Sequence, residues 1–423
     1  MTYETITPQP SCANPNEFGS LRFKDALRQI MNTVEPVNGY EYLPIAQAVG
    51  RTLHEAIVAT TDVPAHTNSA VDGFAMRSED IPEAGHTAQL TVIDTALAGS
   101  PTNLRIRPNT AIRIMTGAVM PPGTDTVLMQ EHVEALNKNI IISDRHFAGD
   151  NVRYAGEDLR KGENILPAGR FCTPADIGLI ASIGIDEIKV KRRIRVALFS
   201  TGSEIHSSGK ALEVGELYDS NRYTLRTALR RLGTEIIDYG IVPDDKIKLL
   251  ETFNQAAACC DALITTGGVS VGKADYTKEV LKDLGQIIFS KVAIKPGRPM
   301  VFGSINGSSF FGLPGNPVAV MVTYYQFLLP ALLKIMGITE TPLIITLKAR
   351  CTEAIRKKPG RTEIQRAILS QSKNGWLART TGKQGSGILK SMSLANAFII
   401  LPHDDGPVKV GEEVLVQPFS GLI

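Results

Sequence analysis

The sequence lacks a large excess of charge of either sign. Its 45 lysines and arginines nearly balance its 43 aspartates and glutamates, which leaves a formal charge of +2. Such a balance provides no overall field that would attract nucleic acid. One basic cluster, KVKRRIR at residues 189–195, alternates into a predicted strand and is interpreted as a solvated strand face. We therefore expect no nucleic-acid partner.

Cysteine is scarce and carries no metal-binding spacing. The five cysteines form neither a CxxC pair nor a zinc-type pattern, and they stand at Cys12, Cys172, Cys259, Cys260 and Cys351. Their odd number and their scatter argue against a disulfide framework and favour a reducing compartment.

The sequence also lacks the pattern of a signal peptide or a membrane span. Residues 1–19 are polar and rich in Pro and Asn, which predicts a disordered tail. The most apolar stretch, at residues 318–333, is short for a span and contains Gln326 and Pro330, so it predicts a buried helix. We expect a cytoplasmic protein without membrane contact.

The pattern of predicted strands and helices changes near residue 195. Before it, Ser20 is predicted to cap an amphipathic helix over 20–34, and short apolar runs between turn clusters indicate a small β-rich domain at 63–150. After it, predicted strands alternate with helices of about a dozen residues, which indicates a parallel sheet covered by helices. Strand-like runs return in the last part of the chain.

These patterns predict a multidomain α/β protein whose central domain is a doubly wound parallel sheet at residues 193–342. At 423 residues, the chain is long enough for about two to four domains. Residues 343–423 are assigned to a C-terminal β domain. Residues 20–62 and 151–192, which flank the small β-rich domain, are assigned to an elongated linker domain.

A glycine-rich stretch, TTGGVSVGKAD at residues 265–275, follows one predicted strand of the α/β domain. It has neither the Walker A pattern nor the dinucleotide spacing of glycines. One interpretation is an anion-binding nest made by the glycines and hydroxyls, with Asp275 as a ligand to Mg²⁺ beside a phosphate. The alternative is a tight turn into a helix that Asp275 caps. The stretch alone leaves both open.

Other predicted strands of the α/β domain end in polar loops as well, and ligands in such sheets bind at the carboxyl ends of the strands. The loops would bring together three acids, Glu204, Asp244 and Asp275, with the cations Lys291, Lys295 and Arg298. Asn316 is placed to cap a further helix that begins at Pro317. Acids that hold Mg²⁺ beside lysines that neutralise phosphate predict a metal-assisted site for a phosphorylated ligand. Individually, each residue could instead be a cap or a solvated charge.

Several motifs resemble those of the molybdopterin molybdenumtransferase family, which includes the C-terminal part of gephyrin-like proteins. In the α/β domain these are TTGGVSVGKADY, SNRYTL, AIKPGRP and FFGLPGNPVA. Outside it, the resemblance is carried by DVPAHTNSAVDGFAMR, RIMTGA, AGEDL, KKPGRTEIQRA and TTGKQGSG. The similarity covers nearly all of residues 20–421.

The resemblance implies a reaction of molybdenum cofactor biosynthesis. Members insert molybdate into adenylylated molybdopterin, use Mg²⁺ and release AMP. The matching catalytic positions are Asp72, Thr116, Asp158, Glu204, Asp244, Asp275, Lys291 and Lys295, of which Glu204, Asp244 and Asp275 surround the metal. The matching substrate-binding positions are Gly267, Gly268, Ser270, Gly272, Arg298, Pro314, Pro317, Arg366 and Ser386. Molybdate and tungstate, both tetrahedral dianions, suit such a site.

The family also implies partners. We expect a homodimer in which the small β-rich domain covers the α/β cleft of the partner subunit, and contacts with a molybdopterin adenylyltransferase and with cofactor-accepting proteins. Two departures stand out: Ser203 replaces an acid common in relatives, and Val71 and Phe74 replace Met and Tyr. The alternatives are an adenylyltransferase, which shares the α/β domain alone, and a gephyrin-like scaffold.

Overall fold

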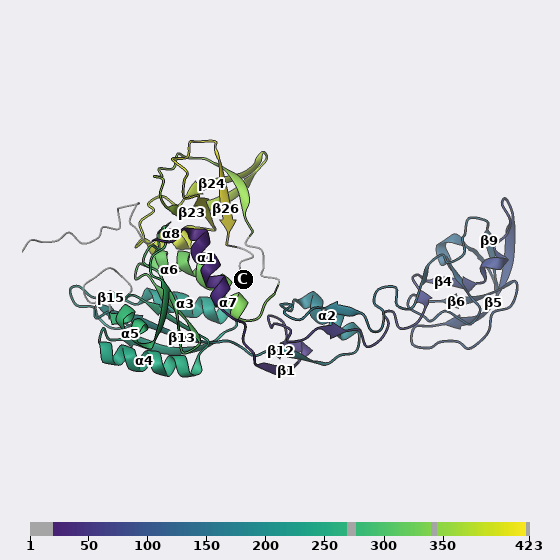
Figure 1. Cartoon of the computed structure of the whole chain (residues 1–423). Coiled ribbons are helices and arrows are strands. Elements are labelled where there is room, and N and C mark those ends of the chain that lie inside the picture. Colours follow the sequence, from purple (N-terminus) through teal and green to yellow (C-terminus); the bar gives the residue numbers. More distant parts are fainter. Residues whose placement is uncertain (1–19, 269–275, 340–344, 420–423) are drawn as a thin grey trace, which may run out of the picture. The chain divides into compact units, whose positions relative to one another are not determined.

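A computed structural model describes residues 20–268, 276–339 and 345–419 (Figure 1). The chain divides into two compact units. One, called the smaller unit, runs from Tyr42 to Val190, and the larger unit contains the described residues up to Glu41 and from Lys191 onward. The predicted tail at residues 1–19 lies outside the described residues.

The larger unit contains a six-stranded sheet in the order β16-β13-β17-β21-β20-β18. The four strands from β16 to β21 are parallel, and β20 is antiparallel to both of its neighbours. The strands and helices of this domain are β13 (Arg195–Thr201), β14 (Ile205–His206), β15 (Leu217–Tyr218), α3 (Ser220–Arg231), β16 (Glu235–Val242), α4 (Lys246–Cys259), β17 (Ala262–Thr266), α5 (Tyr276–Leu284), β18 (Gly285–Phe289), β20 (Val301–Ile305) and β21 (Ser308–Leu313).

The sheet is mixed rather than wholly parallel because a tight hairpin joins β20 to β21. Asn306 and Gly307 both have positive φ, at 48° and 89°, which is the conformation of a type I′ turn. An Asn-Gly pair between two apolar runs is itself a signal for such a hairpin. The predicted α/β class is confirmed: α4 and α5 pack together on the sheet, and α3 and α6 (Pro317–Thr323) form a second helical layer (Figure 1).

The predicted apolar helix is buried in this unit. It consists of α6, a π-helical turn at Tyr324–Leu328 and α7 (Leu329–Ile335). Pro330 cannot bond to the carbonyl of residue 326, and the wider turn accommodates this break. Pro317–Ile335 is the one described helix long and apolar enough to cross a membrane, and 83% of its most apolar window is buried, as in the core helix of a globular domain.

The N-terminal helix α1 (Phe23–Thr33) begins later than predicted. Arg22 occupies the N-cap position without a side-chain cap bond, and Ser20 lies before it. The helix buries Ala26 and Ile30 and contacts α7, and the rings of Phe23 and Phe327 lie 5.2 Å apart (Figure 1). By their contacts, α1 and the rest of residues 20–41 group with the larger unit, because α7 covers the apolar stripe of α1. Their assignment to the linker domain stays a prediction.

A second six-stranded sheet forms the C-terminal part of the larger unit, in the order β19-β23-β24-β22-β26-β25 with a further pairing of β23 and β25. Its first strand comes from the α/β segment, and its core contains Ala367, Ile399 and Val416. The elements are β19 (Ile294–Lys295), β22 (Leu347–Cys351), β23 (Thr362–Ser372), β24 (Gly375–Thr380), α8 (Leu389–Leu394), β25 (Ala397–Leu401) and β26 (Glu413–Pro418).

The smaller unit contains a third six-stranded sheet, in the order β7-β4-β6-β5-β9-β8. The sheet is mostly antiparallel, and its buried residues form two clusters around Leu128 and Ile112. A separate core around Ile180 lies under α2 (Pro174–Ser182), which Thr173 caps. The remaining elements are β1 (Tyr40–Pro44), β2 (Ile57–Val58), β3 (Asn68–Ser69), β4 (Gly73–Met76), β5 (Thr87–Ala96), β6 (Thr110–Ile114), β7 (Thr126–Met129), β8 (Glu134–Leu136), β9 (Asn139–Ser143), β10 (Val152–Arg153), β11 (Asn164–Leu166) and β12 (Glu187–Lys191). The exact domain boundaries stay predictions.

Candidate functional site

A cleft of about 640 Å³ opens at the carboxyl ends of the parallel strands in the larger unit. The loops after β13, β16, β17 and β21 all reach it. Parallel strands present their carboxyl ends at one edge, so residues far apart in sequence meet there. Of the predicted site residues, the structure brings together Glu204, Asp244, Gly267, Gly268, Pro314 and Pro317.

Two glycines at the end of β17 form a turn that no other residue could adopt without strain. Gly267 and Gly268 have φ values of 82° and 62°. A Cβ atom on Gly267 would lie 2.3 Å from the carbonyl oxygen of Thr201, and one on Gly268 would lie 2.5 Å from the Thr201 Oγ1. The N–H of Gly267 donates to Leu313, 3.3 Å away, so this N–H is not available to an anion as the nest hypothesis requires. The hypothesis then depends on Gly268 and on residues outside the described chain.

Replacing Gly268 by Ala is expected to destabilise the protein by roughly 1–3 kcal/mol, the cost of a residue held in an unfavourable backbone region. The new methyl group would also crowd Thr201 and Thr277. Urea unfolding measures the change. Gly315→Ala is the matched control in the same cleft, because its Cβ would meet only Gly267 at an ordinary 3.8 Å. Equal stability of the two variants would contradict a strained turn.

Glu204 and Asp244 place two carboxylates in the cleft on neighbouring loops. Partial burial, with a smaller effect of the charge on Glu204, raises the pKa of Asp244. The alternative interpretation of Asp244 as a helix cap is wrong, because Asp245 caps α4 by accepting from the N–H groups of Ile247 and Lys248, both at 3.0 Å. Asp244 is therefore not engaged in holding the helix.

Two polar atoms beside these carboxylates are buried without a hydrogen-bond partner in the described chain. They are Oγ1 of Thr201 and Oδ1 of Asn221. The amide nitrogen of Asn221 donates to the carbonyl of Gly315 at 2.7 Å, which fixes the side chain between α3 and the loop after β21. Buried polar groups ordinarily have partners, so such atoms in a cleft indicate a place for a polar ligand. Neither residue was predicted from the sequence, although Asn221 lies in the SNRYTL motif.

The predicted cations do not line this cleft. Lys291, Lys295 and Arg298 follow β18, which lies at the far edge of the sheet, and only the adjacent Pro299 reaches the cleft. Lys295 lies in β19, which joins the C-terminal sheet, and its Nζ pairs with Oε1 of the buried Glu363 at 3.2 Å. For Lys295, the pairing of β19 with β23 explains this position. The expectation that all three cations share one rim with the acids stays a prediction.

The start of α6 forms another wall of the cleft. Pro317 occupies the first helical position, as predicted, and Pro314 precedes it in the same loop. Asn316 makes no side-chain cap bond. Instead, the N–H of Val318 donates to the carbonyl of Ser386 at 3.0 Å, so a loop from the C-terminal domain completes the helix start.

Arg366 holds that C-terminal loop and lies away from the cleft lining. Its guanidinium is fully buried and donates to the carbonyl of Gly385 and to Oγ of Ser391, both at 3.0 Å. Burial lowers the pKa of Arg366 to about 10. These bonds position the loop that contains Ser386, rather than presenting the guanidinium to a ligand.

Most of the chain matches models of one family in three successive segments. Residues 21–184 match the MoeA N-terminal region (domain I and II), residues 197–334 a probable molybdopterin binding domain, and residues 348–419 the MoeA C-terminal region (domain IV). A molybdopterin molybdenumtransferase of Haemophilus influenzae is 39% identical over 386 residues, covering 90% of this chain and 95% of that protein. One of Nostoc sp. is 34% identical, covering 93% and 92%. This chain belongs to the molybdopterin molybdenumtransferase family.

A solved structure agrees with this assignment. The crystal structure of the molybdopterin biosynthesis moeA protein from Pyrococcus horikoshii OT3 superimposes with a TM-score of 0.83 at 31% identity. It covers 95% of this chain, and all of that chain is matched. The chain therefore has the multidomain architecture of the molybdenumtransferase family and is a transferase.

Three predicted positions of this molybdenumtransferase lie in the smaller unit. Asp72 accepts from both the N–H and the hydroxyl of Thr116, at 2.7 Å each, and these bonds lower the pKa of Asp72. Asp72 and Thr116 are exposed, so they are available to a ligand or a partner. Asp158 is also exposed, and its backbone N–H donates to the carbonyl of Val63. The remaining predicted positions, Ser270, Gly272 and Asp275, lie outside the described residues.

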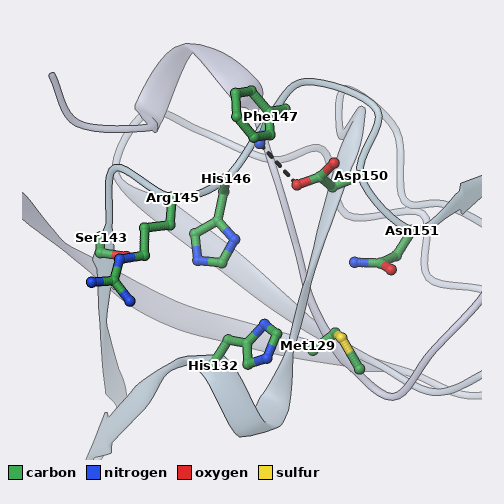
Figure 2. Close-up of a pocket in the computed structure, with 8 residues that line it drawn as sticks. All are labelled: Met129, His132, Ser143, Arg145, His146, Phe147, Asp150 and Asn151. Carbon is green, nitrogen blue, oxygen red and sulfur yellow. Dashed lines mark hydrogen bonds between the residues drawn. The ribbon is translucent and has the colours of Figure 1, made fainter. Parts of the chain in front are cut away.

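A second cavity, of about 540 Å³, lies within the smaller unit of the molybdenumtransferase (Figure 2). The ring centroids of His132 and His146 are 6.4 Å apart, and Oδ2 of Asp150 accepts from the N–H of Phe147 at 2.9 Å. Burial lowers the pKa of His146, the charge of Asp150 opposes this effect, and the charge of His132 adds a smaller lowering. No predicted site residue lines this cavity.

Proposed function

We propose that this protein inserts molybdate into adenylylated molybdopterin and releases AMP in a Mg²⁺-dependent reaction, yielding molybdenum cofactor. The relatives carry the name molybdopterin molybdenumtransferase, which supports the transfer of molybdenum to a molybdopterin. The observation that best supports the finer steps is the cleft at the carboxyl ends of the strands, where Glu204 and Asp244 lie beside the glycine turn.

The cleft suits a magnesium ion that is shared with a phosphorylated substrate. Mg²⁺ prefers one or two carboxylates together with phosphate oxygens and water. Within the described residues, no three His, Cys, Asp or Glu side chains lie close enough to hold a metal ion by themselves. Glu204 and Asp244 fit such an incomplete protein shell, together with oxygens of Thr201 and Asn221 that lack a hydrogen-bond partner in the described part of the chain. When bound, the ion would neutralise charge on the adenylate phosphate.

The protein groups have separate tasks in this proposal. Gly267 and Gly268 permit the tight turn that shapes the cleft at the end of β17, because a Cβ atom on either residue would collide with Thr201. The amide of Asn221, held by the carbonyl of Gly315, and the hydroxyl of Thr201 orient polar groups of the substrate. The walls made by Pro314 and Pro317 are rigid because proline fixes its backbone, so the cleft keeps its shape when the ligand leaves.

The purified protein is expected to convert adenylyl-molybdopterin and molybdate to AMP and molybdenum cofactor only when Mg²⁺ is supplied. AMP release is followed by chromatography, and the cofactor by its ability to activate an apo-molybdoenzyme. Omission of molybdate and chelation of Mg²⁺ are the controls. Formation of adenylyl-molybdopterin from ATP and the pterin would replace this proposal by an adenylyltransferase, and turnover without Mg²⁺ would remove the metal from it.

The proposal includes a homodimer with a shared active site. Asp72 and Thr116 belong to the smaller unit, whereas the cleft belongs to the larger one. The resemblance to the family supports a site to which the two units contribute from different subunits. The upstream partner would then be the enzyme that supplies adenylyl-molybdopterin, and the downstream partners would be the enzymes that accept the finished cofactor.

A further inference from the structure

Two consecutive cysteines, Cys259 and Cys260, lie at the end of α4 and form a close pair of thiols. Their Sγ atoms are 3.6 Å apart. Cys259 is exposed, whereas Cys260 is only 6% exposed. The pair precedes β17, and the cleft lies after that strand, so about 17 Å of strand separates the thiols from the proposed reaction. Neither thiol has a part in the proposed function.

The backbone holds the pair in place. The N–H of Cys260 donates to the carbonyl of Ala256 at 2.9 Å, and the hydroxyl of Ser308 donates to the carbonyl of Cys260 at 2.7 Å. The Cys259 thiol donates to the carbonyl of Gln255 at 3.3 Å. The two sulfurs are therefore kept close by the fold itself, at a helix end that is accessible from one side.

The geometry favours a bridge of one atom over a direct disulfide. A disulfide needs a sulfur–sulfur distance of about 2 Å and a restricted dihedral angle. Cys259 ends the helix, while Cys260 is extended with φ −117° and ψ 152°, and the peptide between them is trans. Bringing the sulfurs to bonding distance would strain this short ring. A single atom bonded to both sulfurs leaves them near their present separation.

We propose that Cys259 and Cys260 form a binding site for trivalent arsenic, taken up as a monosubstituted arsenous oxide. The As=O group condenses with two S–H groups to give two As–S bonds and one water, whose hydrogens are the two thiol protons. Arsenic remains trivalent and both sulfurs keep their oxidation state, so no oxidant or reductant takes part.

The different exposure of the two thiols sets the order of the steps. Cys259 reacts first because it is exposed, and the second As–S bond then forms within the molecule, where the effective concentration of Cys260 is high. Burial, followed by the hydrogen bond and charge of Cys259, raises the pKa of Cys260 to about 12. Cys260 therefore stays a thiol at neutral pH and is a poor target for reagents that need a thiolate.

The test uses the full-length reduced protein and phenylarsine oxide. Intact-mass measurement is expected to show one bound phenylarsenic group with the loss of one water. When the adduct is then unfolded and alkylated, two cysteines should remain unalkylated, and peptide mapping should identify these as Cys259 and Cys260. Release by a small dithiol but not by an equal concentration of monothiol would show that both sulfurs hold the arsenic.

Single variants separate the pair from the other cysteines. Cys259→Ser and Cys260→Ser are each expected to weaken binding at least about tenfold, because a two-point attachment becomes a one-point attachment. Cys172→Ser and Cys351→Ser, which remove buried single thiols, are expected to bind as the unmodified protein does. Unchanged binding by Cys259→Ser, whose exposed position makes misfolding a minor concern, would overturn the proposal, as would an adduct mapped to Cys12.

Discussion

Mixing two inactive variants, Asp72→Ala and Asp244→Ala, is expected to restore about a quarter of the wild-type AMP release. In the proposed shared site, Asp72 of one chain serves the cleft that contains Asp244 of its partner. A mixed dimer then has one site with both lesions and one site with neither. Random pairing makes half of the dimers mixed, and half of their sites are intact.

The experiment depends on verified exchange of subunits. Two affinity tags, one on each variant, allow the mixed dimers to be isolated and their fraction to be measured. A mixture of Asp244→Ala with Glu204→Ala is the matched control, because both residues lie in the same cleft of one chain and no intact site can form. Absence of recovery in isolated Asp72/Asp244 mixed dimers would show that both residues serve the site of their own chain.

Replacing Asp244 by Asn is expected to reduce AMP release at limiting Mg²⁺ by roughly tenfold or more, the scale of a weakened metal site. The substitution keeps the size of the side chain but removes a charged oxygen from the cleft. The loss should shrink as the Mg²⁺ concentration rises. Asp245→Asn is the matched control, because Asn caps a helix about as well as Asp and the neighbouring charge is removed without touching the cleft.

The same variant should not lose stability in the absence of metal. Burial and the charge of Glu204 raise the pKa of Asp244, so the folded protein binds this proton more tightly than the unfolded chain does. The resulting stabilisation is present at pH values below the unfolded pKa and is lost as the pH rises through the folded pKa. At neutral pH, metal-free Asp244→Asn should therefore melt at or above the wild-type temperature, and the difference should vanish in acid. A lower melting temperature at neutral pH, or an equal response of both proteins to a Mg²⁺ titration, would contradict the assigned role.

The α/β class was accessible from the sequence because its signals are local. The alternation of apolar strands with capped helices can be recognised from neighbouring residues. The structure shows β13, β16 and β17 where this pattern predicts them. The antiparallel hairpin at Asn306–Gly307 was equally local but was overlooked. By contrast, the contact of α1 with α7 was not predicted, because an apolar stripe does not specify which surface covers it.

For the candidate site as well, local signals could be recognised in the sequence, whereas long-range contacts could not. Glycine, proline and acidic residues at strand ends indicated Glu204, Asp244, Gly267 and Pro314, since carboxyl ends of parallel strands share an edge. The ion-pair partner of an individual charged side chain could not be derived in this way. Lys295 pairs with Glu363 because β19 lies beside β23, and these two strands are far apart in the sequence.

The sequence by itself determined the family, the α/β class and the loops that form the cleft, because periodicity, turn chemistry and motif spacing act over a few residues. Only the tertiary structure decided that oxygens of Asn221 and Thr201 have no hydrogen-bond partner among the described residues, and that Arg366 holds a loop instead of lining the cleft. It also decided that Cys259 and Cys260 keep their sulfurs 3.6 Å apart. These features depend on long-range packing, in which each side chain takes the partner that the rest of the fold brings to it.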